Sequence, residues 1–455
     1  MAEPFVLRFE WADGTGVREP ALAATMARLE ARVGAHCLTL AHDRASRGVV
    51  EGALVSLLPL ATWAVDCWWF ALYERPRPPG VRSLRLTASP EQARWHRRHG
   101  WLPFREGFAL PDVVFAAESD TEVRLDWFAD PPEAGPMPLA FLGRGSARVS
   151  RAVAEEQLAG LVEAVLTRCE GLDDARLQCL RHRWEVLRTV SQTEAAACRR
   201  AARLGLDALD ADEIDDSLAQ FLEAPPPVEA PIFDELLDVA DDSLPMRLAA
   251  QGAKLARLLE EARRTPRASG VSDAWQKAQE GDSTAGIAQR PFELGYLRAQ
   301  RLRREVLGLN DQVVGAALDE ALDQALLTSV KAVEDAESFL YPGVKALVAH
   351  TDAGPFVATR PLPAPAGRFD RARSLHMLLF RARPGLVTTS FAPDQQASRA
   401  FAAEMLAPAA WLRARLRGVG VDWETVREFA EELRVGDRVV GHQVENHGLA
   451  EVVDG

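Results

Sequence analysis

The first 130 residues alternate short apolar and polar runs, a pattern that predicts strands mixed with helices. "FVLRFEW" (5–11) and "HCLTLAH" (36–42) predict strands, and "EPALAATMARLEARVG" (19–34) between them predicts a helix. "LPLATWAVDCWWFALYE" (58–74) predicts a second helix, and residues 112–128 predict a hairpin of two alternating runs around a polar turn. Most of the 11 Trp residues lie in this region, so we expect an N-terminal α/β module with its own aromatic core.

From about residue 149 to 264 the spacing of apolar residues becomes helical. The clearest case is "SQTEAAACRRAARLG" (191–205), in which Ser191 and Glu194 stand at the spacing of a capping box. The stretch that follows, 265–291, is small, polar and without periodicity. Such composition is typical of a linker or mobile loop.

The last part of the chain returns to a mixed pattern. Residues 346–350 and 355–360 predict a strand pair, and 369–380 predict a helix with one apolar stripe. A further helix is expected at about 393–407, and 427–449 has a helix, short turn, helix pattern. The whole chain therefore predicts a mixed α+β fold that is mostly helical.

These patterns divide the chain into four parts. We expect a Trp-rich α/β module at 1–138, ending in the Pro/Gly-rich stretch 130–138, and a helical domain at 139–264. The linker or mobile loop at 265–291 then leads to a C-terminal domain at 292–455. The length of 455 residues and the hydrophobic content of 47% are ordinary for several globular domains.

Charge bears on nucleic-acid binding. The formal net charge of −13 argues against a broad electrostatic footprint for nucleic acid, although it leaves one local basic patch open. The densest basic run is "RAQRLRRE" (298–305), whose arginines spread over more than half the circumference of a helix. Such a run is typical of a solvated helix face.

Cysteine usage and hydropathy bear on location. The five Cys are odd in number and include no C-x-x-C, which argues against a disulfide framework or a structural zinc site and fits reduced thiols. No basic segment followed by an apolar one opens the chain, and the most apolar run, 53–65, is too short to span a bilayer. We therefore expect a cytoplasmic protein with no membrane span.

The helix expected at 369–380 raises a question of chemistry. Arg373 and Met377 are four residues apart, the relation that two zinc-binding His have on a metallopeptidase helix. Such a helix also needs a Glu beside the first His as the general base for a metal-bound water, and Ser374 stands there.

The surrounding residues resemble the ImmA/IrrE family of metallopeptidase-like proteins. In that family a segment R-F-x-x-A-H-E-L-G-H-x-L-L is followed by a helix E-x-x-A-x-x-F-A-x-x-L-L-M-P. The resemblance covers about 290–449, and the tail 426–449 looks like the helical end of that domain. The matching residues are Arg368, Phe369, Ala372, Leu375, Leu378 and Leu379 in the first segment and Phe401, Ala402, Met405, Leu406 and Pro408 in the second.

The resemblance implies a zincin-type fold for 292–455 in which the chemistry has been replaced. Arg373 takes the place of the first His, Ser374 that of the Glu and Met377 that of the second His, and the acidic ligand falls near Gln395 or Ala397. A guanidinium only donates hydrogen bonds, a thioether is a poor zinc ligand, and a serine hydroxyl is no base for water. We therefore expect no metal, no cofactor and no catalysis.

Two uses of Arg373 remain open. It could bind a carboxylate or backbone carbonyl of a protein partner, or it could pair with Asp370 or Asp394 and plug the former site, which we favour. The neighbouring His376 has no metal-binding residue three or four positions away and is expected in the core or at its rim. The residues that a partner-binding cleft would offer are Arg373, His376, Asp394, Gln395 and Glu404.

Three functions follow from this. Active members of the family cleave repressors in bacterial stress responses and mobile-element control, so the resemblance implies a non-catalytic regulator or scaffold in stress response or phage defence. Its protein partner is not identified by the sequence. The first alternative is an active metal-dependent endopeptidase with an unconventional site. The second is a DNA-binding transcriptional regulator acting through 427–449, although packing of this pair onto the domain is the better interpretation.

One more cluster carries chemistry. "WHRRHG" (95–100) places His96 and His99 three residues apart with two Arg, as a metal or phosphate site would. With no acidic or Cys residue near them in the sequence, we favour a surface helix end.

Overall fold

The computed structural model describes most of the chain and divides it into two compact units. The units are Met1–Ala224 and Pro225–Gly455. The predicted boundary at 130–138 lies almost entirely outside the described residues. The described residues are 2–76, 90–101, 104–105, 107–130, 138–208, 213–241, 243–264, 272–280, 290–335, 337–352, 354–416 and 420–453.

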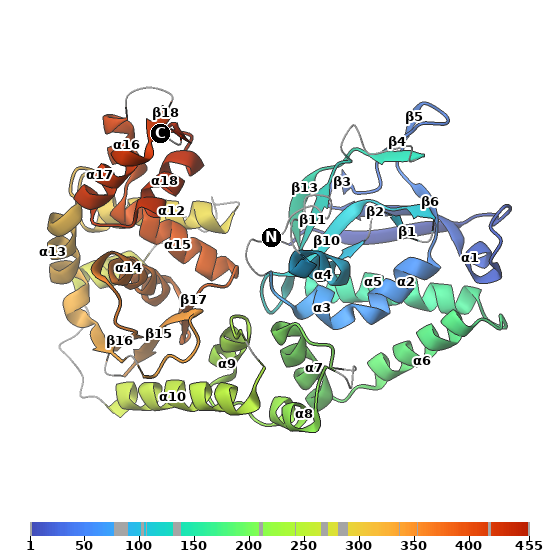
Figure 1. Ribbon diagram of the computed structural model, residues 1–455, viewed down its shortest axis with the longest axis horizontal. Helices are drawn as coiled ribbons and strands as arrows, with labels where there is room; N and C mark the ends of the chain where they lie inside the picture. The colour runs from blue at the N-terminus through green and yellow to red at the C-terminus, as the bar shows by residue number, and fades with distance from the viewer. Residues whose placement is uncertain are drawn as a thin grey trace. The chain divides into compact units, whose positions relative to one another are not determined.

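The first unit combines small antiparallel sheets with helices (Figure 1). Its strands are β1 (Phe5–Trp11), β2 (Met26–Val33), β3 (His36–Cys37), β4 (Ala41–Asp43), β5 (Gly48–Val50), β6 (Ala53–Ser56), β7 (Gly100–Trp101), β8 (Phe104–Arg105), β9 (Phe108–Ala109), β10 (Asp112–Ala117), β11 (Glu122–Phe128), β12 (Leu139–Phe141) and β13 (Gly145–Ser150). Its helices are α1 (Pro20–Ala24), α2 (Leu58–Asp66), α3 (Trp68–Tyr73), α4 (Pro90–His99), α5 (Arg151–Arg168), α6 (Ala175–Thr189), α7 (Gln192–Leu204) and α8 (Asp216–Glu223).

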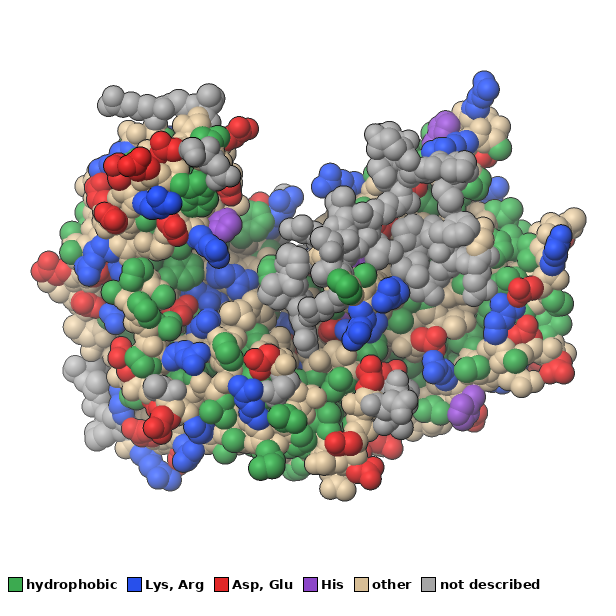
Figure 2. All heavy atoms as spheres, viewed as in Figure 1, with side chains coloured by type: hydrophobic (Ala, Val, Ile, Leu, Met, Phe, Trp, Pro, Cys, Tyr) green, Lys and Arg blue, Asp and Glu red, His purple; other side chains and the backbone are tan. Residues whose placement is uncertain are grey.

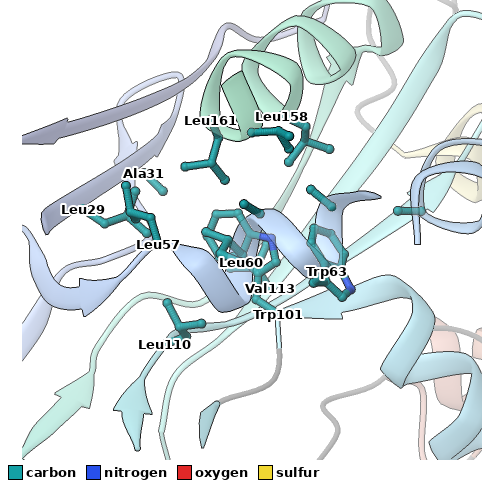
Figure 3. Packing of buried hydrophobic residues seen from close by; sticks show 14 of the residues in the cluster. Leu29, Ala31, Leu57, Leu60, Trp63, Trp101, Leu110, Val113, Leu158 and Leu161 are labelled. Carbon is teal, nitrogen blue, oxygen red and sulfur yellow. The ribbon is translucent and has the colours of Figure 1, made fainter. Parts of the chain in front are cut away.

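Two four-stranded sheets and α5 enclose the core of this unit. One sheet has the order β1-β2-β3 with β6 also paired to β2, and the other has the order β13-β11-β10-β7. Trp63 of α2 and Trp101 of β7 are fully buried in this core together with Leu158 and Leu161 of α5 (Figure 3). The rings of Trp63 and Trp101 meet edge to face with their centroids 6.5 Å apart, a favourable aromatic geometry.

The predicted helix at 19–34 is wrong. Only α1 is helical there, and β2 follows it as a strand paired with β1 on one side and with β3 and β6 on the other. Ala27, Leu29, Ala31 and Val33 are all buried with the two-residue period of a strand. Pairing with neighbouring strands overrides the local helical pattern.

The second unit carries a four-stranded sheet with helices packed on it (Figure 1). Its helices are α9 (Ala230–Leu237), α10 (Pro245–Arg264), α11 (Asp273–Gln279), α12 (Pro291–Arg301) with a π-helical turn (Leu302–Val306), α13 (Gly315–Ala325) with a 3-10 turn (Leu327–Ser329), α14 (Ala364–Phe380), α15 (Pro393–Leu406), α16 (Ala409–Arg415), α17 (Trp423–Leu433) and α18 (Asp437–Asn446). Its strands are β14 (Lys331–Glu334), β15 (Val344–Thr351), β16 (Gly354–Thr359), β17 (Gly385–Thr388), β18 (Gly420–Asp422) and β19 (Glu451–Val453).

The sheet of the second unit has the order β14-β16-β15-β17. β14 and β16 are parallel, whereas β15 runs antiparallel to both β16 and β17. The predicted strand pair, the helices expected at 369–380 and 393–407 and the C-terminal helical pair are confirmed as β15–β16, α14, α15 and α17–α18. The fold is mixed, with more helix than strand.

The region 139–264, which we predicted as one helical domain, is divided between the two units. It contributes α5–α8 to the first unit and α9–α10 to the second. Much of the predicted linker, 265–291, lies outside the described residues, but its middle forms α11, which Ser272 caps and whose Trp275 is fully buried. Within the described residues, every helix is too short or too polar to span a bilayer.

Candidate functional site

α14 is a helix buried on nearly all sides. It packs against β15, β17, α11 and α15. Polar and charged residues are buried within it, although burial of such groups is costly unless each finds a partner. The buried residues are Asp370, Ala372, Arg373, Ser374, Leu375, His376, Met377, Leu378 and Leu379.

Arg373 is 3% exposed and forms the centre of a hydrogen-bond network. Its NH2 group donates to the Thr388 carbonyl oxygen at 2.6 Å and to Gln395 Oε1 at 2.8 Å. Its Nε donates to Ser398 Oγ at 3.2 Å, and its NH1 lies 3.6 Å from Asp370 Oδ1. Burial lowers the pKa of Arg373 to about 9, so the guanidinium remains charged at neutral pH.

Gln395 supplies the acceptor that this guanidinium needs. Its Oε1 accepts from Arg373 and also from the Thr388 backbone N–H at 2.9 Å. Its Nε2 donates to the Leu386 carbonyl oxygen at 2.6 Å. Both ends of the amide are therefore used, which fixes its orientation.

The two positions at which the resemblance placed an acidic ligand have different surroundings. Gln395 faces Arg373, whereas Ala397 lies at the crossing of α12 and α15. There Gly295 of α12 comes so close to the Ala397 carbonyl that a Cβ on residue 295 would collide with it. The two residues thus point to different neighbours.

The side chains of Arg373 and Gln395, together with Glu235 of α9, bind the backbone at the outer edge of β17. Leu386 and Thr388 turn their backbone groups away from β15, toward α9, α14 and α15. Glu235 of α9 accepts from the Leu386 N–H at 2.7 Å, while Gln395 and Arg373 bind the other three groups. An edge strand normally presents unpaired groups to a further strand, but these four are satisfied.

The other two substituted positions do not join this network. Met377 is 1% exposed and belongs to the apolar core of the second unit. Ser374 Oγ donates to the Asp370 carbonyl oxygen at 2.8 Å, one turn back on the same helix. A hydroxyl used in this way bonds within its own helix and presents no base to a substrate.

His376 occupies a separate apolar site. Its ring is 2% exposed and lies against Phe380 and Phe401, with ring centroids at 5.2 and 5.1 Å. Arg298, which stacks on Phe380, places its NH1 3.2 Å from His376 Nε2. Burial lowers the pKa of His376 well below its ordinary value, and Arg298 and Arg373 act in the same direction. The neutral ring therefore accepts from Arg298.

Glu404 lies in a third cluster. Its carboxylate accepts from Gln300 Nε2 at 3.0 Å, Gln443 Nε2 at 2.9 Å and the Ala409 N–H at 3.2 Å. Its side chain is buried, and amide donors rather than a cation satisfy most of its hydrogen-bonding capacity. His447 Nε2 comes to 3.5 Å at the rim of the cluster.

The residues predicted to form a partner-binding cleft therefore do not share one. Arg373 and Gln395 meet, whereas His376 and Glu404 lie in clusters of their own. All four are at most 3% exposed. Asp394 is exposed in the first turn of α15, so it is the one member of the set that a partner can reach in this structure. Asp370 rather than Asp394 is the carboxylate beside Arg373.

The basic run at 298–305 is not the solvated face that we predicted. Arg303 is 1% exposed and donates to the carbonyl oxygens of Met405, Asn310 and Val313. Arg301 donates to carbonyl oxygens at the end of α11. These arginines join segments of the second unit. The face in view in Figure 2 intersperses Lys and Arg with Asp and Glu, without a field of one sign.

The C-terminal helical pair packs inward, as expected. Val426 and Leu433 of α17 and Val440 of α18 are fully buried. Gln443, which a DNA-reading helix would expose, is 1% exposed and donates to Glu404 and to the Ala407 carbonyl oxygen. This side chain cannot reach a base edge in the present arrangement.

The predicted surface helix end at His96 and His99 is wrong. Both side chains are at most 1% exposed, because α4 packs on α3 and β10. His99 contacts the Phe115 carbonyl oxygen at 2.9 Å and Glu74 at 3.0 Å, and Trp95 stacks on it at 3.9 Å. Glu74 is the acidic partner that the local sequence lacked. Burial lowers the pKa of His96 to about 4.

The chain matches no protein-family model and no curated protein sequence. Among the described residues, no three His, Cys, Asp or Glu side chains gather in a way that could hold a metal ion.

Replacing Gln395 by Leu tests the importance of the Arg373 network. The change removes one acceptor of the buried guanidinium and leaves two backbone groups of β17 without their partner, so we expect the free energy of unfolding to fall by about 3 kcal/mol. Denaturant unfolding measures this loss. The matched control is Asp394→Asn on the preceding, exposed residue, which should cost less than about 1 kcal/mol. Equal losses in the two variants would contradict the network's role.

The burial of His376 should make the stability of the second unit sensitive to acid. In the unfolded chain the ring takes up a proton below its ordinary pKa, whereas the folded chain holds it neutral, so stability is lost as the pH falls below that value. The slope should reach at most about 1.4 kcal/mol per pH unit. His376→Phe should flatten it relative to wild type between pH 7 and 5, and the exposed His442→Gln should not. Unchanged slopes in His376→Phe would refute this account.

Proposed function

We propose that the second unit is a metallopeptidase-like domain, related to the ImmA/IrrE family, that has exchanged catalysis for protein binding. In this proposal the chain acts as a regulator or scaffold for a partner protein in stress response or phage defence. The sequence of α14 and α15 supports the relationship, and the residues at the substituted positions support the loss of chemistry.

The observation that carries the proposal is the contact between Arg373 and Gln395. These residues stand where the resemblance places the first His and the acidic ligand, on two different helices, and they meet at 2.8 Å. Two of the ligands in a zinc peptidase share one helix, and the acidic ligand must reach the same ion from another part of the chain. Here a guanidinium-to-amide hydrogen bond occupies the point of convergence.

The surrounding groups favour binding over peptide cleavage. Ser374 is committed to its own helix, and Met377 to the core. The outer edge of β17 is already hydrogen-bonded to side chains, so an extended peptide would have to displace Glu235, Gln395 and Arg373 to pair there. An endopeptidase in this unit would need a different site, and a DNA-binding regulator would need α18 to turn outward.

Restoring the ligands tests the relationship. A variant with Arg373→His, Ser374→Glu, Met377→His and Gln395→Glu should bind about one zinc per chain, because positions 373, 377 and 395 would offer two imidazoles and a carboxylate as ligands. Elemental analysis after gel filtration measures the content. The matched control carries the same changes except Gln395→Leu and should retain clearly less zinc. A folded variant that binds no more zinc than its control would contradict the shared geometry.

Binding without cleavage is tested on the natural chain. Purified wild type should contain no stoichiometric zinc, and a partner that co-purifies from the native host should keep its intact mass during incubation with it. Intact-protein mass spectrometry provides the readout. Cleavage of the partner, lost on chelation, would overturn the proposal in favour of an active peptidase.

A further inference from the structure

A cavity of about 310 Å³ lies in the second unit on the side of α14 that faces away from Arg373. It is lined by one stripe of α14 that includes Arg368, Arg371 and Leu375, and by α13 and the ends of β14 and β16. The size is at the lower end of the range for small-molecule sites in proteins. None of the substituted metallopeptidase positions lines this cavity.

The two helices give the cavity walls of opposite charge. α13 contributes Asp319 and Asp323, one turn apart, and α14 contributes Arg368 and Arg371, also one turn apart. Arg368 forms an ion pair with Asp319 and also donates to the carbonyl oxygens of Gly315 and Leu433. Arg368 and Asp319 therefore already neutralise each other, and their ion pair joins the two helices at one end of the cavity.

The second pair of charges, Asp323 and Arg371, forms no ion pair within the described part of the chain. Asp323 and Arg371 are exposed, and Glu334 and Arg360 join them from the ends of β14 and β16. Within the described part of the chain, these four side chains have no hydrogen-bond or ion-pair partner. Apolar side chains line the cavity beside them, namely Leu322, Leu327, Leu362, Ala372, Leu375 and Leu406.

Arg434 adds a second observation at the same place. It ends α17 with a φ of 56°, a left-handed conformation in which glycine is the usual residue. An arginine held there is strained, because its Cβ crowds the backbone in this conformation. Its guanidinium lines the cavity and contacts Asp319 at 3.2 Å, so an otherwise unfavourable residue contributes charge to the wall.

We propose that this cavity binds a small zwitterion with an apolar body, either a free amino acid or a dipeptide. Its carboxylate would pair with Arg371 and Arg360, its ammonium group with Asp323 and Glu334, and its side chain would cover the leucines. A ligand with both charges complements both open walls at once, whereas a simple anion or cation would leave one of them unpaired. The site includes none of the substituted metallopeptidase positions and does not rest on the protein-binding function proposed above.

Calorimetric titration of the full-length protein with leucine and with leucyl-leucine distinguishes the two sources of this chemistry. We expect one of them to bind with a dissociation constant below about 10 mM, and N-acetyl-leucine and leucinamide, which each lack one charge, to bind at least about tenfold more weakly. Absence of binding by both zwitterions at that concentration, or equal binding of the acetylated or amidated compound, would overturn the proposal.

Two variants locate the binding. Asp323→Asn and Arg371→Gln should each weaken binding of the zwitterion by at least about tenfold. Both residues are exposed, so their thermal unfolding should match wild type. The controls are Glu320→Gln, on α13 outside the cavity, and Arg413→Gln, exposed on α16. Equal affinity in variants and controls would place the ligand elsewhere and refute the assignment.

Discussion

The second unit depends on the burial of one charged group, the guanidinium of Arg373. Because this cation is removed from water, α15 and β17 must bring acceptors to it, and Asp370 of its own helix lies 3.6 Å away. Gln395 meets this need and at the same time binds the backbone of β17 on both sides of Val387. The packing of two helices against a sheet edge is thereby specified by polar contacts as well as by apolar ones, a role known for some buried polar groups.

α14 separates two environments of opposite character. On one side, charges and amides are matched and water is excluded. On the other, Asp323 and Arg371 face a cavity without partners in the described structure. Asp370 connects the two sides, since it lines the cavity and lies 3.6 Å from Arg373. Burial raises the pKa of Asp370 and Arg373 opposes that shift, so a charge that enters the cavity would change the balance around the buried guanidinium.

Local signals in the sequence predicted local structure well. The capping box of Ser191 and Glu194 is formed, and Gly205 follows α7 in the left-handed conformation. Asp370, three residues from Arg373, could be foreseen as its neighbour on a helix. Contacts between segments that are distant in the sequence could not be predicted in this way. Glu74 is 25 residues from His99, and the acceptors of Arg303 are backbone carbonyls, which every residue carries. The sequence likewise left Gln395 and Ala397 equivalent, and only the crossing of α12 over α15 separates them.

The closed edge of β17 restricts how this sheet can be extended. Glu235, Gln395 and Arg373 take the places that the backbone of a neighbouring strand would fill. In the order β14-β16-β15-β17 the opposite edge is β14, a four-residue strand that begins with Lys331. Short edge strands that carry a lysine resist pairing with other chains. Within the described residues of this sheet, β14 is therefore the edge at which strand exchange between copies or fibril growth would have to begin, and it is short and charged.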